Sequence, residues 1–194
     1  MQLIDKTKAK LDKNGIWKTS LGLSEEVALS KKVWDNIYNY GIKTLEKDIK
    51  KFNKTKLQDH LKFILKSYDF TDKTVYLEIG CGPSYIGEYL LKTYNCYFIG
   101  VDLNYEMLVT LKNYLDSKGY KKYILIHADI NQLPIKNETI DYIYGGGVIE
   151  HLPDTKHILK ELYRVLKKGG VSFNTIPAFN LWWLIRFYNN IPSL

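Results

Sequence analysis

The chain has 194 residues, 45% of them hydrophobic, and a formal net charge of +7. Length and composition predict one globular domain of α/β type with an N-terminal helical extension. Residues 1–10 mix charges without an apolar block, so no signal peptide is expected, and no run approaches the roughly 18 apolar residues of a membrane span. Two cysteines, Cys81 and Cys96, are typical of a reducing cytoplasm.

The positive charge is concentrated in the N-terminal part of the chain. Residues 1–73 contain 16 lysines and 10 acidic residues, whereas residues 74–194 are close to neutral. Only Arg164 and Arg186 are arginines. Recognition of phosphates or base edges favours the planar arginine side chain over lysine. Nucleic acid is therefore not the expected partner.

The N-terminal region, residues 1–72, is predicted to be helical and to pack on a core formed by residues 73–194. Ser24 to Tyr40 and Leu57 to Tyr68 are the expected helices. The second helix places Leu57, Leu61, Ile64, Leu65 and Tyr68 on one face, so we expect it to pack on the sheet.

The first strand of the core is expected at Val75 to Ile79, a short and mostly apolar run. Gly80 and Gly82 then turn the chain into a helix that begins near Tyr85. Glycine has no Cβ, so the backbone can lie against a ligand there, with the amides of the helix N-terminus facing it. A second strand, Tyr97 to Asp102, ends on a carboxylate about 20 residues after the glycines, which is the spacing for an acid that binds ribose hydroxyls.

Two classes of nucleoside cofactor fit this pattern, and local residues separate them. A dinucleotide site needs a small residue at the third glycine position of Gly-x-Gly-x-x-Gly, where this chain has Tyr85. Glu78 would also repel a diphosphate. A carboxylate at that position suits a cofactor with an ammonium and a sulfonium group instead.

The run Val75-Tyr-Leu-Glu-Ile-Gly-Cys-Gly-Pro-Ser84 resembles the first motif of the Rossmann-like (class I) S-adenosylmethionine-dependent methyltransferases, of the small-molecule type of methyltransferase domains 11 and 25. The resemblance continues in order and spacing to about Pro177. It implies a doubly wound, mostly parallel sheet with helices on both faces. It also implies S-adenosyl-L-methionine as cofactor, bound by Glu78, Gly80, Cys81, Gly82, Asp102, Leu103, Asp129, Ile130, Gly145 and Gly146.

Within the resemblance, each residue has an expected role. The first-motif acid and glycines hold the methionine part, and Asp102 holds the ribose with Leu103 against the adenine. Asp129 lies near the adenine amino group, although it could also be an ordinary turn residue. For Cys81, packing as a small residue is favoured over action as a nucleophile, and no metal site is expected.

The fourth strand and its loop are expected within Ile140 to Asp154, followed by a helix from Lys156 to Lys168 and a fifth strand from Val171 to Ile176. Lys167 to Gly170 is expected to close the helix. His151 is the candidate catalytic residue, with loop positioning favoured over general base. Glu150 could enclose the cofactor or be solvated, and both alternatives stay open.

The family builds a final antiparallel pair of strands after strand five, whereas only residues 178–194 follow here. We expect a fragment of a longer protein or a short variant, with strand five offering an edge for a homodimer. Leu181 to Tyr188 could pack on further strands, line an acceptor site or contact a membrane surface. The implied function is methyl transfer to the O, N or C atom of a small-molecule or lipid-like acceptor. A non-catalytic cofactor-binding module or partner subunit is the alternative, and an RNA or protein methyltransferase is less favoured.

Overall fold

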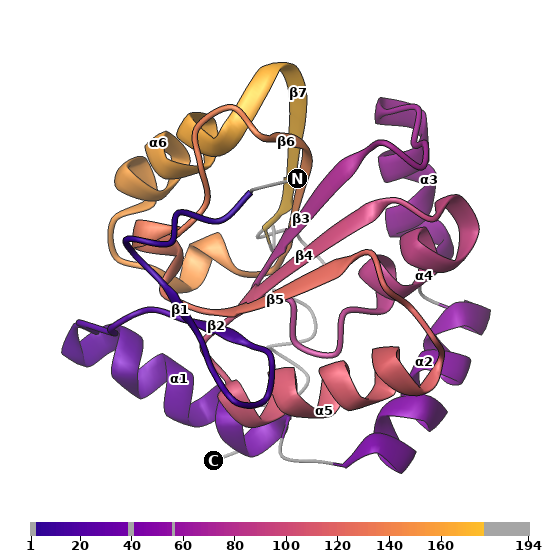
Figure 1. Ribbon diagram of the computed structural model, residues 1–194, viewed down its shortest axis with the longest axis horizontal. Coiled ribbons are helices and arrows are strands. Elements are labelled where there is room, and N and C mark those ends of the chain that lie inside the picture. The colour runs from indigo at the N-terminus through magenta and orange to yellow at the C-terminus, as the bar shows by residue number, and fades with distance from the viewer. Residues whose placement is uncertain (1–2, 39–40, 56, 177–194) are drawn as a thin grey trace, which may run out of the picture.

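A mostly parallel sheet of seven strands forms the centre of the molecule (Figure 1). The structure is a computed structural model that describes residues 3–38, 41–55 and 57–176. The strands follow one another across the sheet in the order β1-β2-β5-β4-β3-β6-β7, and only β1 and β2 pair in antiparallel fashion. Their bounds are β1 Lys10–Leu11, β2 Trp17–Lys18, β3 Val75–Ile79, β4 Tyr97–Asp102, β5 Tyr123–His127, β6 Ile140–Gly146 and β7 Leu166–Thr175.

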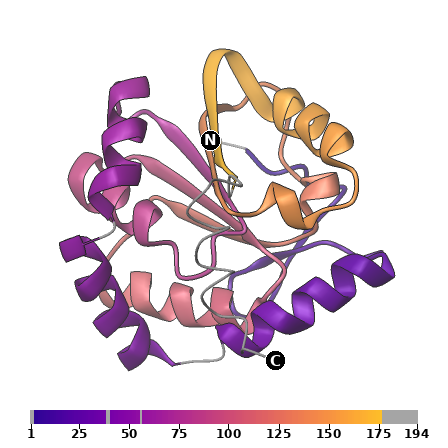
Figure 2. The same ribbon diagram turned by 180° about the vertical axis from the view of Figure 1, so that it is seen from behind.

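Six α-helices and two short 3-10 helices connect the strands of the described chain and cover both faces of the sheet (Figure 2). This arrangement confirms the predicted doubly wound α/β fold with N-terminal helices. The helices are α1 Glu25–Ile37, α2 Ile42–Thr55, α3 Leu57–Ser67, α4 Tyr85–Tyr94, α5 Tyr105–Ser117, η1 Ile130–Gln132, η2 Ile149–His151 and α6 Thr155–Val165.

Successive side chains of the strands point to opposite faces of the sheet, and this alternation produces two core layers. In β3, Val75, Leu77 and Ile79 face one side, where they pack with α6 residues, while Tyr76 faces the other, where α2 to α5 pack. Successive side chains of a strand point to opposite faces, so a strand buried on both faces is apolar at nearly every position. Glu78 is the exception within β3, and it shares the face of Tyr76.

Most sequence-based element predictions agree with the structure. The predicted strand at Tyr97 to Asp102 has the observed bounds, and Asn104 caps α5 by accepting a hydrogen bond from the Met107 backbone N–H at 2.8 Å. In α3, Leu61 and Ile64 are buried in the layer that packs on the sheet. Helix α2 and strands β1 and β2 were not predicted. Strand β2 pairs with β5 and β1 pairs with β2, and these two strands complete the seven-stranded sheet.

The prediction for the end of α6 was wrong. The helix ends at Val165 rather than Lys168, because Leu166 is already extended and pairs with Ile140. Residues 167–170 then bulge out of the ladder before Val171 pairs with Tyr142, and Lys167 binds the Asp141 carboxylate at 2.7 Å. The cations and glycines therefore form a bulge in β7 instead of a helix stop.

In the described sheet β7 is the last strand, paired with β6 alone. The segment Leu181 to Tyr188, and with it the predictions about its packing, lies outside the described residues. Among helices of the described part, none has the length and apolar character needed to cross a bilayer.

Candidate active site

The C-terminal ends of the parallel strands lie on one side of the molecule, and two adjoining pockets lie at these strand ends. The first, called the Asp102 pocket, has a volume of about 130 Å³ and is lined by Val27, Ser30, Lys31, Trp34, Asp35, Tyr38, Gly80, Asp102, Leu103, Asn104, Ala128, Asp129, Ile130, Gly146, Gly147, Val148, His151 and Leu152. The second, called the Glu78 pocket, has a volume of about 480 Å³. Tyr38, Gly80, Gly146 and Gly147 line both pockets, which therefore meet at these residues.

Asp102 is the last residue of β4, and its carboxylate is fixed by backbone amides. Oδ2 accepts a hydrogen bond from the Gly82 N–H at 2.7 Å and Oδ1 accepts one from the Asn104 N–H at 2.7 Å. Burial raises the pKa of Asp102, while these backbone hydrogen bonds act in the opposite direction. A carboxylate has about four lone-pair positions. Asp102 thus keeps acceptor capacity for hydroxyl groups of a ligand in the pocket.

Glu78 lies behind the glycine loop, and its side chain is buried. Its Oε2 accepts hydrogen bonds from the Ser84 hydroxyl at 2.7 Å, the Gly87 N–H at 3.1 Å and the Tyr76 hydroxyl at 3.2 Å. Burial nevertheless dominates and raises the pKa of Glu78 to about 7. The first-motif acid therefore anchors the loop from within and also lines the Glu78 pocket.

The glycine loop brings the backbone close to neighbouring side chains. Gly80 has a φ of +55°, and a Cβ at this position would lie 2.6 Å from a methyl group of Val148. At Gly87, inside α4, a Cβ would lie 2.7 Å from the ring of Phe98. Gly87 provides close helix-to-strand packing two residues beyond Tyr85, the position at which a dinucleotide site would need a small residue, and the sequence analysis did not identify it. The sequence feature that could have revealed this contact is a glycine in the first turn of the helix after the glycine loop.

The predicted adenine-side residues lie together on the wall of the Asp102 pocket. Leu103 follows Asp102, and Ile130 begins η1 beside Asp129. Asp129 Oδ1 also accepts hydrogen bonds from the Asn131 backbone N–H at 2.9 Å and side-chain amide at 2.8 Å. Asp129 thus combines its turn role with a position on the pocket wall.

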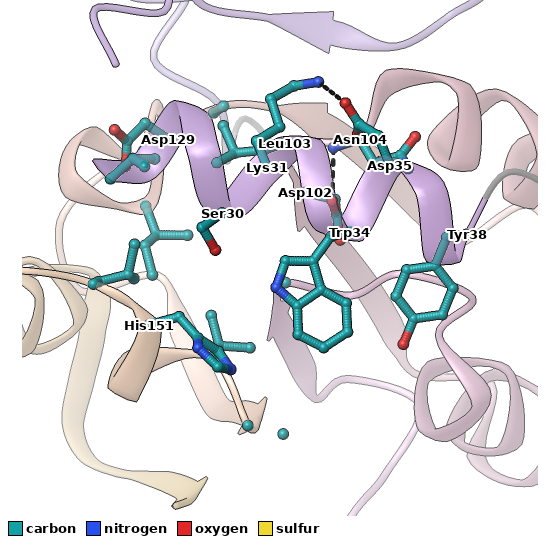
Figure 3. Close-up of a pocket in the computed structure, with 18 residues that line it drawn as sticks. Ser30, Lys31, Trp34, Asp35, Tyr38, Asp102, Leu103, Asn104, Asp129 and His151 are labelled. Carbon is teal, nitrogen blue, oxygen red and sulfur yellow. Dashed lines mark hydrogen bonds and ion pairs between the residues drawn. The ribbon is translucent and has the colours of Figure 1, made fainter. Parts of the chain in front are cut away.

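Helix α1 forms the wall opposite Asp102 (Figure 3). Its pocket-facing residues recur with helical spacing, and Trp34 stacks on Tyr38 with ring centroids 5.8 Å apart. Most of them are polar or aromatic and only partly buried, which favours a cover over the pocket rather than plain core packing. The sequence analysis did not identify Ser30, Lys31 and Asp35 as pocket residues.

His151 lies in η2 on the rim of the same pocket, where its ring meets the edge of Trp34 at a centroid distance of 5.7 Å (Figure 3). Both carboxylate oxygens of the adjacent Glu150 are buried and lack a hydrogen-bond partner in the structure as described. The Glu150 carboxylate is therefore not solvated in this structure, contrary to one of the two alternatives.

Two predicted residues, Gly145 and Cys81, have mainly packing contacts, and a third, Gly82, donates its backbone N–H to Asp102. Gly145 and Gly82 line neither pocket, and a Cβ on Gly145 would lie 2.4 Å from Asn174 Oδ1. Cys81 lines the Glu78 pocket and is buried, and burial raises the pKa of its thiol well above the ordinary value. A thiol held in its neutral form is a poor nucleophile.

The Asp102 pocket carries the charges that a cationic ligand needs. Asp35, Asp102 and Asp129 line it, whereas Lys31 is its one lysine or arginine among the described lining residues and is paired with Asp35 at 2.5 Å. An excess of carboxylates disfavours a pyrophosphate and suits a ligand with a sulfonium and an ammonium group. The carboxylates, the apolar residues and the exposed backbone at Gly80 and Gly146 suit the polar and apolar groups of S-adenosylmethionine.

Comparison with known proteins identifies relatives of this kind. Residues 77–173 match the methyltransferase domain family Methyltransf_11. A demethylmenaquinone methyltransferase of Bacillus cereus is 35% identical over 100 residues, which cover 48% of this chain and 42% of the relative. The match thus spans less than half the length of this curated relative.

Solved structures share the fold at lower identity. A putative S-adenosyl-L-methionine-dependent methyltransferase of Methanococcus maripaludis has a TM-score of 0.57 and 23% identity, covering 80% of this chain and 66% of that one. A phosphoethanolamine N-methyltransferase of Haemonchus contortus, solved with S-adenosylhomocysteine, has a TM-score of 0.58 and 18% identity, covering 68% and 32%. Because the family match spans half of the sequence, the chain belongs to the class I S-adenosyl-L-methionine-dependent methyltransferases of the Methyltransf_11 domain family.

Proposed function

We propose that this protein transfers the methyl group of S-adenosylmethionine to a small-molecule acceptor. The observation that carries the proposal is the meeting of two pockets at Gly80, Gly146 and Gly147. The Asp102 pocket has the carboxylates and apolar walls for the adenosine part. The Glu78 pocket, lined by aromatic and hydroxyl side chains, gives an acceptor access to the same point.

Each binding residue has a role in this proposal. Asp102 would hold the ribose hydroxyls, Leu103 and Ile130 would flank the adenine, and Asp129 would accept a hydrogen bond from its amino group. The bound donor supplies a methyl group activated by the positive sulfonium. Glu78 and the glycine loop would hold the methionine part, and Glu78 in its charged form would favour the positive donor over its neutral sulfide product.

Positioning and exclusion of water carry much of such a displacement. Helix α1 would serve this purpose by closing over the Asp102 pocket with Trp34 and Tyr38. We propose the division into an N-terminal cover, residues 1–72, and a binding core, residues 73–194, on the same basis. His151, against Trp34 at the rim, would position the loop at the join between cover and core.

Ligand-dependent melting tests the cofactor assignment. S-adenosylmethionine and S-adenosylhomocysteine at about 100 times their dissociation constants should each add roughly 2.7 kcal/mol, or about 5–10 °C in Tm for a chain of this size. NAD should add nothing, because its pyrophosphate would meet the carboxylates of the pocket. A comparable shift with NAD and none with the methyl donor would overturn the proposal.

Methyl-labelled donor then tests the acceptor class. After incubation with cell extract, label is expected in the small-molecule fraction. Label recovered in RNA or protein would contradict the acceptor class. Binding of the donor without any transfer would favour the non-catalytic module or partner subunit.

A further inference from the structure

A histidine and a tyrosine in the Glu78 pocket form a pair that belongs to none of the cofactor motifs. His60 Nδ1 of α3 lies 2.7 Å from the hydroxyl of Tyr144 on β6. The two rings meet edge to face with centroids 6.2 Å apart, and both residues line the pocket. They are 84 residues apart in the sequence, so only the packing of α3 on the sheet brings them together.

The Tyr144 hydroxyl lies where the two pockets meet. A Cβ on Gly146, which lines both pockets, would be only 2.6 Å from this hydroxyl oxygen. Tyr144 is 5% exposed, and its ring stacks on Phe173 at a centroid distance of 6.1 Å. The Tyr144 ring is therefore held in place, with its hydroxyl beside the Gly146 backbone at which the Asp102 and Glu78 pockets meet.

The chemistry of the Glu78 pocket restricts the acceptor. Its described lining contains neither lysine nor arginine, so a phosphate or carboxylate group would find no permanent cation there. Three tyrosine rings can instead contact a flat aromatic acceptor. The titratable lining residues are Tyr38, His60, Glu78, Cys81, Tyr85 and Tyr144.

Among these groups, His60 is in hydrogen-bond contact with the Tyr144 hydroxyl, through Nδ1 at 2.7 Å. Glu78 already accepts three hydrogen bonds on Oε2, and the Cys81 thiol is buried. Burial raises the pKa of the Tyr144 hydroxyl, which keeps it protonated and able to donate to His60 Nδ1. Imidazole is the side chain whose ordinary titration range lies near neutral pH.

We propose that Tyr144 and His60 relay a proton from a phenolic or enolic acceptor bound in the Glu78 pocket. This inference rests on the function proposed above. As the acceptor oxygen bonds to the methyl carbon, the carbon–sulfur electron pair stays with sulfur. The acceptor O–H proton passes to the Tyr144 hydroxyl, whose own proton passes to His60 Nδ1. The imidazolium then releases that proton to water, so the products are the sulfide, the methyl ether and one proton.

Para-nitrophenol is a suitable probe, because its phenolate and phenol forms absorb differently. We would titrate it into the full chain saturated with S-adenosylhomocysteine, near neutral pH. Wild type should bind the probe and increase its phenolate fraction. His60→Gln should bind it without that increase, because glutamine can accept the Tyr144 hydrogen bond but no proton. Tyr144→Phe should bind about 2- to 10-fold more weakly, as expected for one lost hydrogen bond.

The matched control is His157→Gln, a histidine of α6 whose Nε2 contacts the Asn131 carbonyl outside both pockets. It should behave as wild type. Nitrogen-15 spectra of the wild-type histidines add a readout without mutation, since His60 should shift toward the protonated form when the probe binds.

The outcomes separate the two proposals. Absence of S-adenosylhomocysteine binding in wild type would overturn the proposed function. If S-adenosylhomocysteine binds normally, three results would overturn the relay alone. They are absence of probe binding, a phenolate increase in His60→Gln equal to that in wild type, and a His60 nitrogen-15 signal that does not shift when the probe binds. Para-nitroaniline should bind more weakly than para-nitrophenol. If it binds equally well, and bound para-nitrophenol shows no increase in its phenolate fraction, the result would indicate an amine acceptor and contradict the relay.

Discussion

The two walls of the Asp102 pocket are held in place to very different degrees. On the sheet side, Asp102 is fixed by two backbone N–H groups, and Glu78 behind it by three donors. On the α1 side, Val27 is the one buried residue of the helix. The ion pair between Lys31 and Asp35 has side chains 27% and 37% exposed, and such partly exposed pairs contribute little to stability.

This difference suggests a division of labour. A wall built from strand ends and backbone hydrogen bonds is preorganised, so it can recognise the cofactor before anything moves. A helix with few buried contacts belongs to the less stable parts of a fold, from which ligand-binding covers are drawn. Changes in the sheet wall should therefore affect stability and affinity strongly, and changes in α1 should affect affinity weakly and stability hardly at all.

The largest expected effect concerns the stability contributed by Glu78. Its pKa rises from 4.5 to about 7 on folding, so the folded protein binds this proton more tightly than the unfolded chain. The resulting contribution is complete below about pH 4.5 and is lost as the pH rises through about 7. Glu78→Gln removes the loss, which is on the order of 3 kcal/mol. Urea unfolding at about pH 5 and about pH 8 should show a smaller decrease for the variant than for wild type.

Glu106→Gln, at an exposed position of α5, is the matched control and should keep the wild-type pH dependence. If wild type and Glu78→Gln lose the same stability between the two pH values, Glu78 does not titrate in this range. The sheet wall would then be less desolvated than its geometry indicates.

A somewhat smaller effect is expected for cofactor affinity in Asp102→Ala. A hydrogen bond to a charged group contributes about 1.5–3 kcal/mol, so S-adenosylhomocysteine should bind roughly 10- to 150-fold more weakly in calorimetry. Asp116→Ala removes a carboxylate that binds Lys112 and Tyr123 away from the pocket, and should leave affinity unchanged. Equal affinity in wild type and Asp102→Ala would show that the ribose site is elsewhere.

The same contrast explains how far the sequence could be interpreted. Asp102 and the glycine loop are local: a short apolar strand, a turn and a carboxylate at fixed spacing predict their position. Gly87 and the β7 bulge depend on what packs against them, Phe98 in one case and the Ile140 pairing in the other. The pocket face of α1 and the pair of His60 with Tyr144 require tertiary contacts between distant segments. No spacing in the chain encodes these contacts.

The smallest expected effect tests the α1 wall itself. Trp34 lines the Asp102 pocket, and a contact of its ring with the aromatic base of a bound cofactor would contribute about 0.5–1.5 kcal/mol. Trp34→Ala should therefore weaken S-adenosylhomocysteine binding about 2- to 12-fold, with little change in the Tm of the free protein. Leu29→Ala, on the outer side of the same helix and 69% exposed, is the matched control and should change affinity by less than about 0.5 kcal/mol. A large fall in the Tm of free Trp34→Ala, with affinity retained, would mean that α1 belongs to the core rather than covering the pocket.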